Sequence, residues 1–259
     1  MRVREKRFES FFKDSVYLFY KNHLYNFLVR RHVVRKNLRG SRFQTILELG
    51  CGTSPMLDTS VRAVQTDLSW QALSFLRLSS KNGKDLRPVA CDATHLPFRD
   101  EAFDCVICSE VIEHIEEDEL ALQEIARIVK RGGELILTCP LHQKYFGFDD
   151  RLVGHYRRYE LPELTNRLTE MGFQDCRSNS VLGLLEKQVM DKVAKLWVFL
   201  KGRKGEDRPL GLGTQILAWL FLPFYLLINY ALAAAVTAQA QITSLEKTVT
   251  VCLRCRKTT

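Results

Sequence analysis

The stretch ILELGCGT, residues 46–53, joins a short apolar run to two glycines. The apolar run predicts a buried β-strand, and Gly50 and Gly52 predict a tight turn directly after it. Glycine at such a turn lets the backbone bend sharply and lets a ligand come close to it. Because open parallel sheets bind ligands beyond the carboxyl ends of their strands, this turn is the first candidate ligand site.

Around this stretch, short apolar runs alternate with helical patterns from residue 43 to about residue 185, which is typical of a mainly parallel α/β sheet. A later stretch that alternates and carries β-branched residues predicts one more strand. The predicted strands span residues 45–49, 63–67, 87–91, 103–108, 134–139, 173–181 and 248–255. The predicted helices between them span residues 70–79, 118–130 and 161–171.

Two aspartates stand at the ends of the second and third predicted strands. Asp67 lies 17 residues after Gly50, where a carboxylate can accept hydrogen bonds from both hydroxyls of a ribose. Asp92 can face the edge of an adenine ring. Since parallel strands end at the same edge of a sheet, these acids and the glycine turn predict a nucleoside-containing ligand. A dinucleotide-binding turn would need glycine at position 55, where Pro55 stands, so that class is disfavoured.

As a set, five motifs resemble those of the class I S-adenosylmethionine-dependent methyltransferases, in particular the subgroup that acts on small molecules. The motifs are ILELGCGT, VQTDLS, CDATHLPF, FDCVICSEVIEHI and VKRGGELILTCP, and the resemblance covers about residues 40–185 together with 247–257. It implies an α/β, Rossmann-like sheet, mostly parallel with an antiparallel seventh strand, and S-adenosylmethionine as the cofactor. The family's usual third glycine is replaced here by Ser54.

The resemblance also implies which residues hold the cofactor. The glycine turn and Glu48 before it correspond to the part of the family site that holds the methionine moiety, and Asp67 corresponds to the ribose ligand. Residues after the second and third strands frame the adenine. The implied cofactor residues are Glu48, Gly50, Cys51, Gly52, Asp67, Leu68, Asp92, Ala93 and Ser109.

The segment after the fourth predicted strand contains three metal-competent side chains, Glu110, Glu113 and His114. At the start of a helix they can lie on one side, and carboxylates with an imidazole suit Mg²⁺, Mn²⁺ or Zn²⁺. The segment resembles the Glu-x-x-Glu-His of the ubiquinone-biosynthesis O-methyltransferases, where it is a proposed metal site. The same letters also occur in the superfamily without a metal, where they shape the floor of the active site. A divalent cation and a structural role are therefore both open.

Methyl transfer from a sulfonium is an in-line displacement, so the protein mainly positions the acceptor and removes a proton. The candidate bases are His114, His142 and His155. His155 belongs to the segment GHYRRY, residues 154–159, which resembles an element before the fifth helix of related bacterial enzymes. Such a segment suits a phenolic or phosphorylated acceptor. Solvated arginines and a packed tyrosine are the alternative interpretation.

The positive charge of the chain is concentrated in one segment. The formal net charge is +8, and residues 1–42 contain 12 Lys and Arg residues against 3 acids. Apolar and aromatic residues recur at helical spacing over residues 8–38, with basic residues between them, which predicts a basic amphipathic helix. Such an arm suits an anionic membrane surface or a lid packed over the next domain, and the two interpretations are compatible.

A second unusual segment precedes the last predicted strand. Residues 186–208 are strongly charged, whereas residues 209–245 form a run of 37 positions without a charged residue. Pro223 and Asn229 interrupt this run, which favours two shorter helices or a kinked one. Because the last strand must return to the sheet, we expect a hairpin or a pair of interfacial helices, with both ends cytoplasmic. Burial in a subdomain or a dimer interface is the alternative.

The eight cysteines are scattered, and the charged start of the sequence lacks the features of a secretory signal peptide. We therefore expect all eight to be reduced thiols in a cytosolic compartment. Two Cys-x-x-Cys pairs, 105/108 and 252/255, lie in strand-like runs. The two side chains of each pair then point to opposite faces of a sheet and cannot share one metal.

These features divide the chain into a basic helical arm (1–42), a methyltransferase domain (43–185 with 247–257) and a membrane-associating insert (186–246). We expect an S-adenosylmethionine-dependent methyltransferase that O-methylates a lipid-soluble or lipid-linked small molecule at the cytoplasmic face of an anionic membrane. The alternatives are an RNA methyltransferase that uses the basic arm and a non-catalytic membrane-binding module on the same fold. Nucleic acid is disfavoured, because residues 109–112 are SEVI where base methyltransferases usually carry Asp/Asn-Pro-Pro-aromatic.

Overall fold

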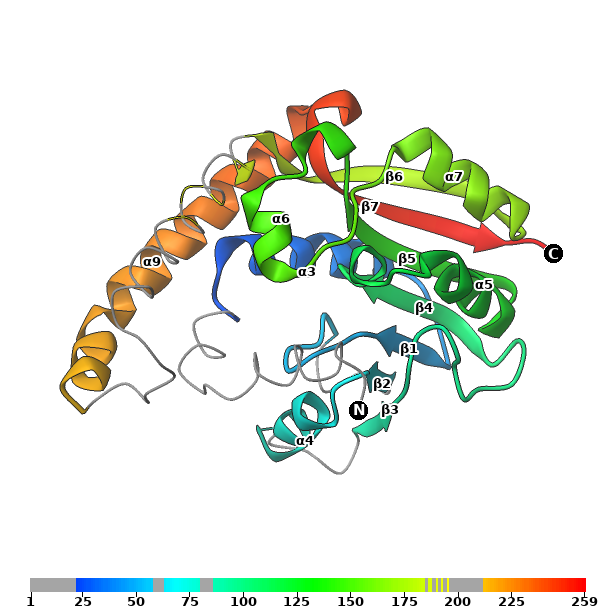
Figure 1. The fold of residues 1–259 in the computed structure, drawn as a ribbon, viewed down its shortest axis with the longest axis horizontal. Coiled ribbons are helices and arrows are strands. Elements are labelled where there is room, and N and C mark those ends of the chain that lie inside the picture. The colour runs from blue at the N-terminus through cyan, green and yellow to red at the C-terminus, as the bar shows by residue number, and fades with distance from the viewer. Residues whose placement is uncertain are drawn as a thin grey trace.

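The computed structural model describes residues 22–57, 63–79, 86–184, 186, 187, 190, 192, 195 and 212–259 (Figure 1). Residues 1–21 of the predicted arm lie outside the described residues, and so does most of the charged segment before residue 212. The described residues form one sheet that is covered by helices on both faces.

Seven strands form this sheet in the order β3-β2-β1-β4-β5-β7-β6. Strands β1 to β5 pair in parallel, and β7 runs antiparallel to both of its neighbours, β5 and β6. The predicted fold class, a mostly parallel α/β sheet with an antiparallel seventh strand, is confirmed. The strands are β1 (Ile46–Leu49), β2 (Ala63–Asp67), β3 (Arg87–Ala90), β4 (Phe103–Ser109), β5 (Val129–Pro140), β6 (Phe173–Gly183) and β7 (Thr248–Lys257).

The two faces of the sheet pack against different helices because successive residues of a strand point to opposite sides. In β4, Ile107 packs in a cluster with Phe27 of α3, whereas Val106 packs in a cluster with Leu122 of α5. Within the described residues, the helices with defined bounds are α3 (Tyr25–Leu38), α4 (Trp70–Ser79), α5 (Asp118–Ile128), α6 (Phe148–Val153), α7 (Leu161–Glu170) and α9 (Leu212–Ile242). Three short 3₁₀ turns are η1 (Ile112–His114), η2 (Gln143–Tyr145) and η3 (Leu245–Lys247).

The largest difference from the sequence expectations concerns the apolar segment before β7. Instead of two short helices or a hairpin, α9 is one helix of 31 residues with Pro223 in its interior. Proline removes one backbone donor, but α9 is rich in leucine and alanine, which strongly favour the helix. A smaller difference is that α5 ends at Ile128, because Val129 pairs with Phe103 and begins β5.

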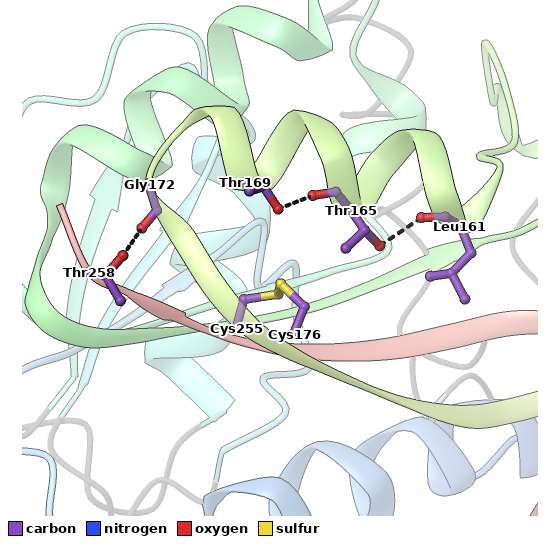
Figure 2. Close-up of a disulfide and its surroundings, with 7 residues drawn as sticks. All are labelled: Leu161, Thr165, Thr169, Gly172, Cys176, Cys255 and Thr258. Carbon is purple, nitrogen blue, oxygen red and sulfur yellow. Dashed lines mark hydrogen bonds between the residues drawn. A yellow bond between two sulfur atoms is a disulfide. The ribbon is translucent and has the colours of Figure 1, made fainter.

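A disulfide joins Cys176 on β6 to Cys255 on β7 (Figure 2). The two residues are 79 positions apart, and the antiparallel pairing of β6 with β7 brings their Cα atoms to 4.1 Å. The expectation that every cysteine is reduced is therefore wrong for this pair, while the other six cysteines are free. In both Cys-x-x-Cys pairs, the two residues join core clusters on opposite faces of the sheet.

Candidate active site

A cavity of about 380 Å³ lies at the carboxyl ends of β1, β2 and β4. Most of the cofactor residues implied by the sequence come together on its surface, although they belong to different strands. Eight of the nine line the cavity: Gly50, Cys51, Gly52, Asp67, Leu68, Asp92, Ala93 and Ser109. The remaining one, Glu48, does not.

The glycine turn after β1 is held by the acid at the end of β2. Gly50 and Gly52 have φ angles of +65° and +56°, a region that favours glycine. A side chain at Gly50 would also collide with Val111. Asp67 accepts hydrogen bonds from the backbone N–H groups of Gly52 at 2.7 Å and Ser69 at 2.8 Å. The turn is therefore fixed in a shape that lets backbone, rather than side chains, face the cavity.

Glu48 supports the residues that follow this turn. Its side chain is buried and accepts hydrogen bonds from the backbone N–H groups of Met56 at 2.5 Å and Leu57 at 3.4 Å. Burial raises the pKa of this carboxyl group to about 7, although both hydrogen bonds oppose the rise. The structure thus places Glu48 where it orders the loop after the glycine turn instead of on the cavity surface.

The opposite part of the cavity contains an acid–histidine pair. His155 Nδ1 lies 2.8 Å from Oδ1 of the buried Asp150. Arg158 Nε donates to both oxygens of Asp150 at 3.0 Å, and Lys187 Nζ donates to Oδ2 at 2.7 Å. Burial acts to raise the pKa of Asp150, but the hydrogen bonds from these three side chains outweigh it and hold the pKa well below its usual range. Because an ionised carboxylate only accepts, Nδ1 of His155 carries the proton and Nε2 can accept one.

The structure separates the three histidines that the sequence offers as bases. His114 and His155 both line the cavity, and their rings meet edge to face with centroids 4.6 Å apart. His142 does not line it. The backbone N–H of His142 donates to the carbonyl oxygen of Tyr159 at 2.8 Å, and the ring Nδ1 of His142 lies 3.1 Å from Glu160 Oε2. These two contacts hold His142 away from the cavity, so the prediction of His142 as a base is not supported.

The predicted metal ligands are rearranged. Glu113, His114 and His155 each offer one ligand atom within 4.8 Å of the others. Glu110 is not part of this group, because its Oε2 pairs with Arg30 at 3.1 Å. His155 therefore takes the place in this group that the sequence predicts for Glu110.

Glu113 itself is completely buried. Neither of its carboxyl oxygens has a hydrogen-bond partner within the part of the chain that the structure describes. Burial first, and then the neighbouring Glu110, raise the pKa of Glu113 well above its usual range. A carboxyl group with two unpartnered oxygens beside two imidazoles fits a small divalent cation, and it equally fits a neutral, protonated acid.

Helix α3 belongs to the arm for which a membrane contact and a lid over the next domain were both expected, and it supplies one wall of the cavity. Asn26, Phe27 and Arg30 line the cavity from this helix. The ion pair between Arg30 and Glu110 links α3 to the segment after β4. Glu110 has a φ angle of +55°, a strained conformation for a residue with a side chain and one that is often found at functional sites. The described half of the arm is thus a packed part of the site.

Two functional candidates were missed for different reasons. Asp150 lies only five residues before His155, so an acid at this spacing from a candidate base was a usable signal. Arg30 carried no such signal, because it meets Glu110 only through the packing of α3 on the sheet.

Comparisons with known proteins identify a methyltransferase domain within the chain. Residues 47–137 match the family model of a methyltransferase domain. The chain is 32% identical over 128 residues to a demethylmenaquinone methyltransferase of Renibacterium salmoninarum, covering 48% of this chain and 52% of the relative. It is 34% identical over 124 residues to a demethylmenaquinone methyltransferase of Streptomyces avermitilis, covering 46% and 52%. The matched part of the chain thus spans about half the length of these relatives.

Two solved structures share the fold over nearly the whole chain. A methyltransferase of Thermotoga maritima, described as a possible histamine N-methyltransferase, superposes with a TM-score of 0.62 at 16% identity, covering 98% of this chain and 99% of that one. Phosphoethanolamine N-methyltransferase 2 of Haemonchus contortus, in complex with S-adenosylmethionine, has a TM-score of 0.62 at 15% identity, covering 97% and 60%. At such identities the likeness concerns the fold alone. The strand order, the glycine turn and the match over residues 47–137 together support a class I S-adenosylmethionine-dependent methyltransferase domain in this part of the chain.

Proposed function

We propose that the chain transfers the methyl group of S-adenosylmethionine to an oxygen atom of a lipid-soluble or lipid-linked small molecule. The observation that carries the proposal is a single cavity in which the implied cofactor residues meet the Asp150–His155 pair. Two relatives named for demethylmenaquinone support an acceptor that dissolves in lipid.

The residues of the cavity divide between binding and proton transfer. Asp67 and Asp92 would bind the nucleoside, and the backbone of residues 50–52 would hold the methionine moiety. The cofactor supplies an activated methyl group. In the transfer, the sulfur–methyl bond would break as the bond to the acceptor oxygen forms, and S-adenosylhomocysteine would leave. His155 Nε2 would accept the hydroxyl proton, and the carboxylate of Asp150 would stabilise the resulting imidazolium. His114, beside His155, would help to position the acceptor.

The triad of Glu113, His114 and His155 allows a second use of the same atoms, in which a divalent cation is held there and polarises the acceptor oxygen. The two uses exclude each other, because a ring nitrogen that binds a cation cannot also accept a proton. The contact with Asp150 leaves Nε2 of His155 available for either use, and we propose proton transfer as the one that needs no additional ligand. Methyl transfer that stops in a chelator and returns with Mg²⁺, Mn²⁺ or Zn²⁺ would instead favour the cation.

We place this reaction at the cytoplasmic face of an anionic membrane. Within α9, residues Leu220–Ile242 are long and apolar enough to interact with a bilayer, with a mean hydropathy of 1.8. Basic residues precede the apolar run in the sequence and suit anionic headgroups. By contrast, two arginines of the arm bind inside the protein, Arg30 to Glu110 and Arg35 to the carbonyl oxygen of Met56, which weakens the RNA alternative.

The test is an assay with isotopically labelled S-adenosylmethionine on total membrane lipid extract and, separately, on total RNA. We expect label in the lipid fraction and a mass increase of one methyl group in the product. Calorimetry with S-adenosylhomocysteine is run on the same protein. Cofactor binding without any lipid labelling contradicts the proposed acceptor class, labelled RNA favours the alternative, and absence of cofactor binding favours a non-catalytic module.

A further inference from the structure

Helix α9 presents two different faces. Its inner face packs on α3 and β6, where Ala233 and Val236 contact the core cluster beneath α3. Its outer face carries large apolar side chains that are mostly exposed, and Phe224 and Leu227 are 67% and 68% exposed. The large outer-face residues are Leu220, Phe221, Phe224, Leu227, Ile228 and Leu232. The helix therefore has a docked side and an open, apolar side.

The docked side is held by a polar contact as well as by packing. Asn229 is buried, and its Oδ1 accepts a hydrogen bond at 3.0 Å from the backbone N–H of Tyr25. Tyr25 is the first residue of α3, where a helix leaves its backbone N–H groups without partners of its own. The Asn229 amide group also donates to the carbonyl oxygen of Tyr225 at 2.9 Å. The side chain of Asn229 is thus fixed between the two helices.

This docking leaves too little free helix to cross a bilayer. From Asn229 onward, α9 is attached to α3 and β6, and it leads through η3 directly into β7 (Figure 1). The apolar run before Asn229, residues 216–228, is 13 residues long. At 1.5 Å per residue this run measures about 20 Å, and the whole of α9 before Asn229, residues 212–228, measures about 25 Å. The hydrocarbon core of a bilayer is about 30 Å thick. A crossing by residues 220–242 would require α9 to leave the sheet.

The lack of charged residues on the open face of α9 favours contact with lipid over contact with a soluble partner. Residues 209–245 contain no charged side chain, whereas interfaces with soluble partners carry a polar rim. Residues 201–208, just before this run, carry four bases against two acids; the bases are Lys201, Arg203, Lys204 and Arg208, and the acids are Glu206 and Asp207. An apolar helical face next to basic residues is the arrangement of helices that lie in the headgroup region of anionic membranes.

We propose that α9 lies flat in the membrane interface, with its outer face toward the acyl chains and its inner face still docked on α3 and β6. It anchors the protein to one leaflet and does not cross the bilayer. This inference rests on the membrane location in the proposed function and specifies how that location is achieved.

The first test is co-flotation of the full chain with vesicles of phosphatidylcholine and phosphatidylglycerol. The double variant Phe224→Ser/Leu227→Ser removes two outer-face side chains, and its vesicle partition should fall at least about tenfold. The matched control, Leu78→Ser/Leu120→Ser, changes two exposed leucines on α4 and α5 and should float like the parent. Equal flotation of the outer-face variant and the parent would overturn the proposal. So would a parent that does not float and instead forms a dimer in sedimentation that the outer-face variant loses.

The second test measures depth by quenching of tryptophan fluorescence with brominated lipids. In a background where Trp70, Trp197 and Trp219 are changed to Phe, a single tryptophan is placed at Phe221 or at Ala231, both exposed on α9. A flat helix predicts that bromines near the headgroups quench both positions most strongly. Strongest quenching of Ala231→Trp by bromines at the acyl-chain ends would show a crossing helix and overturn the proposal. S-adenosylhomocysteine binding, measured without vesicles, reports separately on the proposed function.

Discussion

The carboxylate of Asp150 binds Nδ1 of His155, and other side chains hold this carboxylate in place. Arg158 and Lys187 bind Asp150 from other sides, so the acid stays ionised and keeps the proton of His155 on Nδ1. The nitrogen that remains available, Nε2, belongs to a histidine that lines the cavity.

This pair predicts a selective loss of rate on substitution of His155. In His155→Gln, methyl transfer should fall by about 10²–10⁴-fold, because the proton acceptor is lost. S-adenosylhomocysteine affinity should stay close to that of the parent, because the cofactor residues lie elsewhere in the cavity. The matched control is His142→Gln, which alters a histidine outside the cavity. Initial rates and calorimetry on both variants test this, and equal rates for the two would contradict the role of His155.

The glycine turn predicts a second, paired comparison. Gly50 and Gly40 both have positive φ angles, +65° and +80°, but only Gly50 faces a neighbour, the Val111 side chain. Gly40→Ala should lower the free energy of unfolding by about 1 kcal/mol, the cost of a left-handed conformation. Gly50→Ala adds a clash and should cost about 2–4 kcal/mol in total, with weaker cofactor binding. Urea unfolding measures both, and similar losses for the two variants would show that Val111 simply moves aside.

Glu186 predicts a pH dependence of stability. Burial raises its pKa to about 7, with Arg30 opposing the rise and Glu110 adding to it. Because the folded state holds the proton more tightly, the stabilisation is complete below the pKa of the unfolded chain and is lost as pH rises through about 7. Glutamine does not titrate, so Glu186→Gln should not lose stability as pH rises. Its free energy of unfolding should exceed that of the parent by up to about 3 kcal/mol at pH 8 and by little at pH 4.

Urea unfolding across this pH range gives the measurement for Glu186. Glu163→Gln, on the exposed surface of α7, provides the control for removal of a negative charge. A stability difference between Glu186→Gln and the parent that stays constant with pH would mean that Glu186 does not titrate in this way.

The Cys176–Cys255 disulfide predicts a response to reductant. Closing a loop of 79 residues restricts the unfolded chain, and such a link typically contributes about 2–4 kcal/mol. Reduction should therefore lower the urea midpoint of the parent and leave the midpoint of Cys176→Ala unchanged. Intact mass before and after reduction and alkylation shows whether two thiols are released. If the urea midpoint of the parent does not change with reductant, the disulfide does not stabilise the folded protein.

Local sequence patterns were sufficient to predict most strands of the fold and part of the candidate site. The strands were predictable because each combines an apolar run with a clear boundary, and Asp67 and Asp92 were predictable because strand ends converge at one edge. The continuity of α9 was not predictable from Pro223, since the effect of proline depends on how strongly the surrounding residues favour a helix.

Contacts between segments that are distant in the sequence could not be predicted from such local patterns. The register of β6 against β7 decides that Cys176 meets Cys255, and the packing of α3 decides that Arg30 meets Glu110. The group formed by Glu113, His114 and His155 likewise depends on how the segment after α6 returns to the segment after β4. The sequence predicted two of its three members and placed Glu110 in the position of the third.

The place of β7 in the sheet has a consequence for how the protein is made. Strand β6 borders only β7, and β7 is also the partner that joins β6 to β5. In chain order, however, α9 comes between β6 and β7, so α9 leaves the ribosome while the edge of β5 and the whole of β6 still lack their neighbour. The sheet can therefore be completed only after α9 has been made, because β7 must insert between two strands that precede α9 in the chain.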